Sequence, residues 1–260
     1  MRAFAIFVVS LIALLAMPAA AQPRIALVVG NEKYGGGLET LNNAVDDAQL
    51  ITRELEDAGF DVEPVPDAGM ETLSAALERF TDRLKQAGPN AVGLFYYAGH
   101  GLQYQGTNYL MPTDATVVDP ADISRKGFDP VRVLWAMQDG GARTMIVILD
   151  ACRQNHVSDS LRPVAEEGLT RFNRKGLDKK RSVVIVYSTG LGEPAADGAK
   201  EDGNGPFATI LAENIGVPDQ GIVDLFDNVS TQLVDAIDQK PYLELGLYGS
   251  EKFAFVSAAR

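Results

Sequence analysis

Six short stretches of the chain have the pattern of β-strands. Four of them are almost continuously apolar and rich in β-branched or aromatic residues, which is typical of strands buried on both faces of a parallel sheet. These four are Arg24–Val29, Ala91–Ala98, Thr144–Leu149 and Ser182–Ser188; Phe60–Val65 and Lys252–Val256 complete the set.

Apolar residues recur at helical spacing in the segments between these strands. The expected helices are 44–58, 71–86, 131–138, 206–215 and 223–237. Asn42 or Asn43 is expected to cap the first helix, and Leu102–Thr113 to form a short hairpin at the sheet edge. Because strands and helices alternate, right-handed crossovers and a parallel sheet follow. The sequence therefore predicts an α/β fold with about six mostly parallel strands flanked by helices.

Two of the buried strands lead into reactive side chains. Ala91–Ala98 runs through Gly99 into His100, and Thr144–Leu149 runs through Asp150 into Cys152, the only cysteine in the chain. If the two strands are neighbours, His100 and Cys152 leave the sheet at the same edge, where open α/β sheets build their sites. We therefore expect a base beside a thiol.

This pairing suits nucleophilic catalysis. A free thiol has a pKa near 8.5, and a nearby imidazole raises its thiolate fraction and later protonates a leaving amine. Gly99 and Gly101 let a substrate backbone approach, and the backbone amides of Gly101 and Cys152 are candidate oxyanion donors. Singly, a buried cysteine and a loop histidine are unremarkable; together they favour a dyad. His156 lies in a polar segment without flanking glycines and ranks below His100.

The residues around the dyad resemble those of the caspase-like cysteine peptidases, which include caspases, metacaspases and bacterial relatives. YYAGHG at 96–101 is followed about fifty residues later by LDAC at 149–152, a spacing known in this clan. The resemblance extends to RIALVVGNEKY at 24–34, LNNAVDDAQLI at 41–51 and GNGPFATILAENI at 203–215. It implies a three-layer α/β/α sandwich and hydrolysis of peptide bonds by a thiolate.

The resemblance also implies a substrate pocket lined by acids. Asp47, a better match than Asp46, and Asp150 correspond to two metacaspase pocket acids, which together would select arginine or lysine before the scissile bond. Ser188 ends a strand whose following loop shapes the substrate cleft in this family, which makes Ser188 a further candidate pocket residue. The alternatives are that Asp47 only complements a helix dipole and that Asp150 only caps local amides.

Charge and the first residues indicate the setting in which the protein acts. The 23 basic and 35 acidic residues give a net charge of −12, which argues against nucleic acid or an anionic membrane surface as partner and favours a cationic substrate. Residues 1–21 have the parts of a cleaved signal peptide, with Arg2, an apolar run and Ala19–Ala21; an uncleaved anchor is the alternative. We expect an exported protein, periplasmic or secreted, with one peptidase domain over 22–260.

The segment 153–181 changes character, since it holds eight basic and four acidic residues in an otherwise acidic chain. We interpret it as a loop joining large-subunit and small-subunit parts, which in relatives of this clan is cut by the enzyme itself. The alternative is a solvated basic loop. The candidate cleavage sites are Arg174, Lys175, Lys179, Lys180 and Arg181.

Many metacaspases are activated by calcium, but this sequence has no DxDxDG run or dense acidic cluster. Asp114, Asp119, Asp122 and Asp129 are interpreted as a solvated loop. We therefore expect no metal and no cofactor, and the pattern carries no signal for an oligomeric state.

The sequence thus favours a cysteine endopeptidase that cleaves after arginine or lysine in peptide or protein substrates. A catalytically idle caspase-like module that binds or scaffolds in the periplasm is the alternative, because a fold does not fix a function. A structural cysteine in another α/β enzyme would require a second acid or base cluster, and the sequence offers none.

Overall fold

The structure is a computed structural model that describes residues 22–152, 171–172, 174–190, 195–198, 201, 203–248 and 253–258. Its centre is a seven-stranded mixed sheet in which the strands follow the order β2-β1-β3-β5-β6-β7, with β4 attached to β3. The strands are β1 (Arg24–Gly30), β2 (Asp61–Pro66), β3 (Val92–Tyr104), β4 (Thr107–Leu110), β5 (Thr144–Cys152), β6 (Ser182–Tyr187) and β7 (Tyr242–Gly246). β1, β2, β3, β5 and β6 are parallel, and β7 runs antiparallel to β6.

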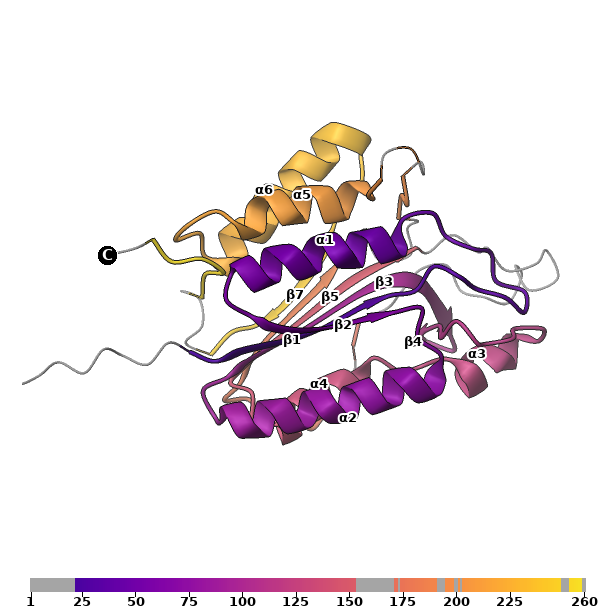
Figure 1. The fold of residues 1–260 in the computed structure, drawn as a ribbon, viewed down its shortest axis with the longest axis horizontal. Helices are drawn as coiled ribbons and strands as arrows, with labels where there is room; N and C mark the ends of the chain where they lie inside the picture. The colour runs from indigo at the N-terminus through magenta and orange to yellow at the C-terminus, as the bar shows by residue number, and fades with distance from the viewer. Residues whose placement is uncertain are drawn as a thin grey trace, which may run out of the picture.

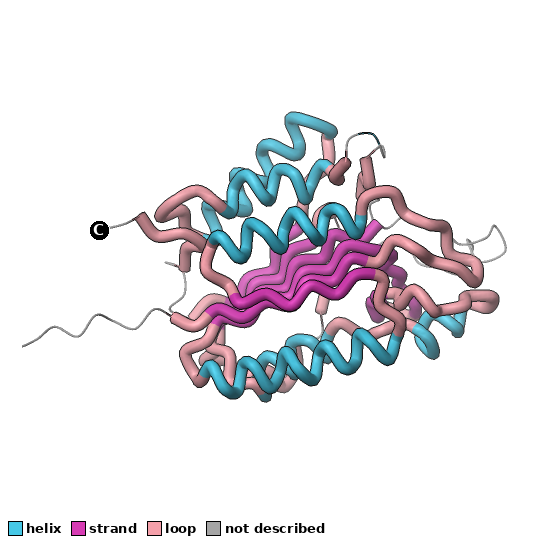
Figure 2. The backbone as a smooth tube through the Cα atoms, viewed as in Figure 1, coloured by secondary structure: helices cyan, strands magenta, loops and turns pink. Residues whose placement is uncertain are grey.

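Helices cover both faces of this sheet, as Figures 1 and 2 show. They are α1 (Ala44–Asp57), α2 (Met70–Ala87), α3 (Pro120–Lys126), α4 (Val131–Asp139), α5 (Pro206–Ile215) and α6 (Ile222–Ile237). α1, α5 and α6 lie on one face, and α2 and α4 lie on the other. The predicted α/β/α sandwich is confirmed.

The alternation of side chains along β3 shows why the strand patterns are continuously apolar. Leu94 and Tyr96 pack into the core under α1, α5 and α6, whereas Phe95 and Tyr97 pack into the core over α2 and α4. Both faces of the strand are therefore buried, and period-two alternation leaves no polar side. The hairpin expected after Leu102 is also present, because the end of β3 pairs antiparallel with β4.

The prediction of a last strand at Lys252–Val256 is wrong. In its described part, Ala254 and Val256 form only isolated bridges, to Gly221 and Pro218, and the Arg24 guanidinium donates hydrogen bonds to the carbonyls of Ala254 and Phe255. The edge of the sheet is instead formed by β7, which the sequence pattern did not reveal. In β7 the charged residue is the buried one and the apolar residue is the exposed one, since Glu244 is buried and Leu245 is exposed.

Two local predictions also need correction. Asn43 occupies the N-cap position of α1, but its side chain makes no capping hydrogen bond there and its Nδ2 donates to the carbonyl of Asp197 instead. The acids expected in a solvated loop include Asp119 and Asp122, which form a capping box at the start of α3. Pro120 at the first helical position completes a helix start that the sequence did carry.

Among the described residues, no helix is both long and apolar enough to cross a bilayer.

Candidate active site

His100 and Cys152 occupy partner positions on neighbouring strands. β3 and β5 pair in parallel from Val92 opposite Thr144 to His100 opposite Cys152, so the expected adjacency of the two strands is confirmed. Each strand is longer than predicted, and Cys152 is the last residue of β5 rather than a residue beyond it. The uninterrupted register brings the two backbone positions to the same edge of the sheet.

The imidazole of His100 is enclosed by the loop that follows β1. The side chain is buried, its ring centroid lies 4.5 Å from that of Tyr34, and its Nε2 lies 2.7 Å from the carbonyl oxygen of Glu39. Because a carbonyl oxygen only accepts hydrogen bonds, Nε2 must carry a proton. In the neutral ring, Nδ1 is then the basic nitrogen.

The residues on either side of His100 have different surroundings. Gly99 has a φ of +154°, and a Cβ there would lie 2.6 Å from the hydroxyl oxygens of both Tyr34 and Tyr97. Gly101 is buried and lies opposite Leu110 in the β3–β4 pair. Gly99 is therefore required by packing, and Gly101 begins the part of β3 that turns away with β4.

Asp47 connects the first helix to the start of α5. Its side chain is buried, and its Oδ1 accepts hydrogen bonds from the Gly205 amide at 2.7 Å and from Asn204 Nδ2 at 3.1 Å. Gly205 is the N-cap residue of α5 and has no side chain of its own to cap the helix. Asp47 thus supplies the carboxylate that a helix N-terminus favours, while Asp46 on the same turn is half-buried.

Asp150 lies two residues before the cysteine, at the end of β5. Its Oδ2 accepts a hydrogen bond from the hydroxyl of Tyr96, a buried residue of β3, at 3.1 Å. The hydroxyl of Ser188 is near enough to lower the pKa of Asp150, although its buried Oγ completes no hydrogen bond of standard geometry with the described residues. Ser188 is therefore beside the predicted pocket acid.

Asp47 and Asp150 lie close enough for the charge of Asp150 to act on Asp47. Burial raises the pKa of Asp47, and the charge of Asp150 raises that pKa further, against the opposing effect of the Gly205 and Asn204 hydrogen bonds. Burial is also the main cause of the raised pKa of Asp150. Two carboxyl groups whose pKa values rise mainly through desolvation, one of them also through the charge of the other, are poorly solvated neighbours.

A third carboxylate, Asp197, belongs to the same group and was missed by the sequence analysis. Its charge raises the pKa of both Asp47 and Asp150, and its Oδ2 accepts a hydrogen bond from the Asn42 amide at 2.8 Å. Asp197 lies in the turn-rich segment after β6, where one more acid carried no distinguishing pattern. The buried Tyr96, whose pKa is raised by burial and then by Asp150 and Asp47, was missed because its position in a strand predicted only a core role.

The structure describes only some of the remaining residues to which the sequence analysis gave a role. Residues 1–21, His156 and most of the basic segment lie outside the described residues. In its described end, Lys175, Lys179 and Lys180 are exposed, whereas Arg174 and Arg181 are half-buried, and Arg181 donates to the Ala142 carbonyl. Within the described residues, no three His, Cys, Asp or Glu side chains form a group that could hold a metal ion.

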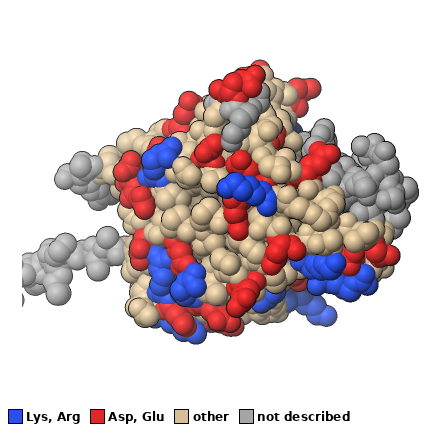
Figure 3. All heavy atoms as spheres, turned by 45° about the vertical axis from the view of Figure 1, so that its right-hand side comes forward, with Lys and Arg blue, Asp and Glu red and all other residues tan. Residues whose placement is uncertain are grey.

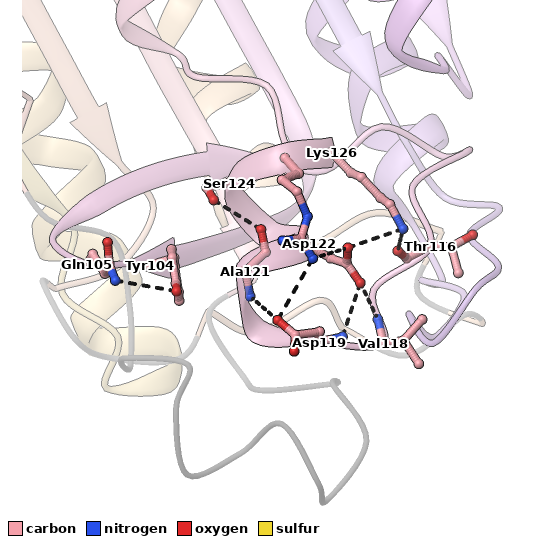
Figure 4. A network of polar contacts seen from close by, with 10 residues as sticks. Tyr104, Gln105, Thr116, Val118, Asp119, Ala121, Asp122, Ser124 and Lys126 are labelled. Atoms are coloured by element: carbon pink, nitrogen blue, oxygen red, sulfur yellow. Dashed lines mark hydrogen bonds and ion pairs between the residues drawn. The ribbon is translucent and has the colours of Figure 1, made fainter.

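The capping network of α3 supports the same edge of the sheet from outside (Figure 4). Asp122 accepts hydrogen bonds from the amides of Val118 and Asp119 at 3.1 Å, and Lys126 donates to the Thr116 carbonyl at 2.6 Å. The adjacent Val117 amide donates to the carbonyl of Gly36 at 2.7 Å. The α3 cap therefore holds the segment 116–118, to which the loop after β1 is hydrogen-bonded.

The negative charge is spread rather than concentrated on the face seen in Figure 3. Acidic side chains are scattered over that face, with smaller groups of basic side chains among them. The acidic residues whose charges raise the pKa of the buried Asp47 are instead the half-buried Asp150 and Asp197. The local acidity of the site thus comes from side chains withdrawn from the surface.

Comparison with known proteins agrees with this architecture. The family model described as the caspase domain matches residues 23–248, so the chain belongs to the caspase domain family, a family of cysteine peptidases. It is 26% identical over 215 residues to the mucosa-associated lymphoid tissue lymphoma translocation protein 1 of Homo sapiens, a match that covers 82% of this chain and 24% of the relative; its homologue from Mus musculus matches equally. The chain spans about a quarter of the length of these curated relatives.

Solved structures show the same fold at lower sequence identity. Protein GSU0716 from Geobacter sulfurreducens aligns with a TM-score of 0.65 at 16% identity, covering 90% of this chain and 99% of that one. Caspase-1 from Spodoptera frugiperda aligns with a TM-score of 0.62 at 15% identity, covering 91% and 93%. The predicted caspase-like sandwich is confirmed, and the dyad and pocket residues remain predictions.

Proposed function

We propose that the protein is a cysteine endopeptidase in which His100 and Cys152 form the catalytic dyad. The observation that carries the proposal is the parallel register that makes the two residues partners at one edge of the sheet. The Cys152 thiolate attacks the scissile carbonyl carbon and forms a thioester as the amine leaves with a proton from His100; water then hydrolyses the thioester with His100 as base. The backbone amides of Gly101 and Cys152 are proposed to donate to the oxyanion.

The contact between His100 and Glu39 supports this division of roles. Since Nε2–H donates to the Glu39 carbonyl, Nδ1 takes the proton from the thiol and returns it to the leaving amine. The same carbonyl stabilises the imidazolium that forms during the cycle, because a hydrogen bond from a charged donor is stronger than one from a neutral donor.

The proposed substrates carry arginine or lysine before the scissile bond. The charges of Asp150 and Asp197 raise the pKa of Asp47, the charge of Asp197 raises that of Asp150, and Ser188 lies beside Asp150. A guanidinium or ammonium group would bring this group of carboxylates the opposite charge and further hydrogen-bond donors. An aspartate side chain would add a further negative charge and be rejected.

The setting is proposed from the sequence. The features of residues 1–21 favour export with cleavage after Ala21, and N-terminal sequencing of the mature protein should begin at Gln22. A protein retaining Met1 would favour the anchor instead. No metal, nucleic acid or membrane surface is assigned to the reaction.

Activity and substrate preference are tested together with a set of peptides that differ only in the residue before the scissile bond. Arginine and lysine peptides should be cleaved by the wild-type protein and not by Cys152→Ala, and the aspartate peptide should remain intact. An arginine-based thiol-reactive peptide should label Cys152. If the folded wild-type protein neither cleaves the set nor becomes labelled, the idle binding module is the better description.

A further inference from the structure

The loop after β1 contacts His100 through more than the Glu39 carbonyl. Tyr34, five residues earlier in the same loop, lies against the imidazole with an angle of 54° between the rings. Its hydroxyl oxygen also accepts a hydrogen bond from the backbone amide of His100 at 2.9 Å. One residue therefore touches both the ring and the main chain of the proposed base.

The hydroxyl of Tyr34 is part of a closed circuit of hydrogen bonds around His100. It lies 3.1 Å from the hydroxyl of Tyr97, and the Tyr97 oxygen lies 2.9 Å from the carbonyl oxygen of His100 and 3.1 Å from that of Met111. A carbonyl oxygen only accepts, so the Tyr97 proton points to these carbonyls and the Tyr34 proton points to Tyr97. The circuit then joins the amide and the carbonyl of His100 through two phenols.

The circuit fits only because residue 99 is glycine. A Cβ at that position would lie 2.6 Å from both phenol oxygens, closer than atoms not bonded to each other approach. The φ of +154° at Gly99 is also one that other residues rarely adopt. The glycine before the histidine therefore makes room for the two hydroxyl groups.

The loop that carries Tyr34 is itself fixed, so Tyr34 can serve as a rigid support. Asp67 Oδ1 accepts hydrogen bonds from the amides of Glu32 at 3.0 Å and Lys33 at 2.9 Å. The Asn31 amide donates to the carbonyl of Ala98 at 2.9 Å. The base of the loop is thus bonded to β3 two residues before His100.

From these contacts we propose that Tyr34 is a positioning residue of the active site, which holds the main chain and the imidazole of His100 in the orientation that presents Nδ1 to Cys152. The inference rests on the proposed function. Tyr97 completes the circuit through its hydroxyl group. Tyr34 acts through His100 and need not touch the substrate.

The test separates the hydroxyl of Tyr34 from its ring. Tyr34→Phe removes the hydrogen bond to the His100 amide and keeps the ring, and Tyr34→Leu removes both. One net hydrogen bond corresponds to roughly a 3- to 10-fold change, and loss of the aromatic contact as well to roughly 10- to 100-fold. We expect these losses in kcat for an arginine peptide, with KM unchanged.

A second readout follows the thiol itself. If His100 is held less well, it stabilises the thiolate less, and the pH midpoint for alkylation of Cys152 by iodoacetamide should rise toward the value of an ordinary thiol, near 8.5. Tyr187→Phe is the matched control, because Tyr187 is a buried tyrosine with a 2.9 Å hydrogen bond to Glu244, and β5 lies between its strand β6 and the strand of His100. The Tm of each variant, measured by thermal unfolding, checks that Tyr34→Phe and Tyr187→Phe lose similar stability.

The outcomes distinguish this inference from the function on which it rests. A rise in the alkylation midpoint in Tyr34→Phe, greater in Tyr34→Leu and absent in Tyr187→Phe, supports the positioning role. Tyr34 variants that match Tyr187→Phe in both kcat and midpoint overturn it while leaving the dyad intact. A wild-type protein that cleaves no peptide and whose thiol already has a midpoint near 8.5 overturns both proposals.

Discussion

The two halves of the proposed site are built in opposite ways. Around His100, the ring and both backbone polar groups have hydrogen-bond partners within 3 Å, supplied by Tyr34, Glu39 and Tyr97. Around Asp47 and Asp150, burial and the charges of neighbouring acids raise the pKa values of the carboxyl groups. The hydroxyl oxygens of Ser188 and Thr189 nearby are buried without a hydrogen-bond partner among the described residues.

This difference indicates which half of the proposed site a bound substrate would stabilise. The histidine half is already organised and needs nothing further to hold its base in place. The carboxylate half places like charges in a poorly solvated environment, which is energetically costly, and a basic side chain would relieve that cost. Binding of the substrate cation is thus expected to stabilise the half that the fold leaves strained.

The largest effect is expected from removing the base in the organised half. His100→Ala should lower kcat/KM for an arginine peptide by roughly 10²- to 10⁴-fold, which is the usual contribution of general acid–base catalysis. His156→Ala is the matched control and should retain wild-type activity. Steady-state kinetics of both variants would contradict the dyad if the loss appeared at His156 instead.

A smaller but selective effect is expected from neutralising the carboxylate half. Asp47→Asn should lower kcat/KM for an arginine peptide by roughly 10²-fold, since the substrate cation loses a buried partner. The amide oxygen of asparagine can still accept the Gly205 and Asn204 hydrogen bonds made by Asp47 Oδ1, so the start of α5 is retained. An equal loss for a peptide with an uncharged residue at the same place would show that Asp47 acts only as a helix cap.

The same variant should change stability in the opposite direction to activity. Because the pKa of Asp47 is raised in the folded state, the wild-type protein loses stability as pH rises through the interval between the unfolded and folded pKa values. Asp47→Asn removes this loss, so its Tm relative to wild type should be higher at pH 8 than at pH 4. A Tm difference that does not vary with pH would mean that Asp47 is not strained.

Cation binding in the carboxylate half should release protons. The raised pKa values of Asp47 and Asp150 mean that part of the population is protonated near neutral pH, and a bound guanidinium favours the ionised form. Calorimetric titration of Cys152→Ala with an arginine peptide, in buffers of different ionisation enthalpy, should report the release of protons. The same titrations should show tighter binding at pH 8 than at pH 6. Binding that is equally tight at both pH values would place the cation elsewhere.

The proposed preference for basic residues also predicts where the protein would cut its own chain. Lys175, Lys179 and Lys180 are exposed, whereas Arg181 is half-buried and bonded to the Ala142 carbonyl, so self-cleavage should follow the lysines. Mass spectrometry of the incubated protein should find these ends in wild type and none in Cys152→Ala. Identical intact bands in both proteins would refute self-cleavage.

The smallest effect is expected at the outer support of the histidine half. Hydrogen bonds from Val118, Arg125 and Asp119 lower the pKa of Asp122, so its contribution to stability is present above its unfolded pKa and is lost as pH falls toward the folded value. Asp122→Asn should lower Tm by a few degrees at pH 7 and by less at pH 3. If Asp122→Asn loses kcat at a temperature where the variant is still fully folded, the α3 cap is coupled to His100.

Much of the sandwich could be predicted from periodicity because its determinants are local. Continuous apolar runs identified β1, β3, β5 and β6, and helical spacing identified five of the six helices among the residues that the structure describes. The pattern failed at β7, where a buried Glu244 bonds to Tyr187 and an exposed Leu245 reverses the usual alternation. It also failed at α3, where the Asp119–Pro120 start was present but was attributed to a solvated loop.

The sequence by itself determined the layered fold and the two strand ends that carry His100 and Cys152, since each depends on residues close together in the chain. Only the tertiary structure decided the in-phase register of β3 and β5, the protonated Nε2 facing Glu39, and the grouping of Asp197 with Asp47 and Asp150. Asp197 accepts a hydrogen bond from Asn42, which lies 155 residues earlier in the chain. No local pattern encodes such a contact, because it exists only when helices and loops from distant segments pack on the same edge of the sheet.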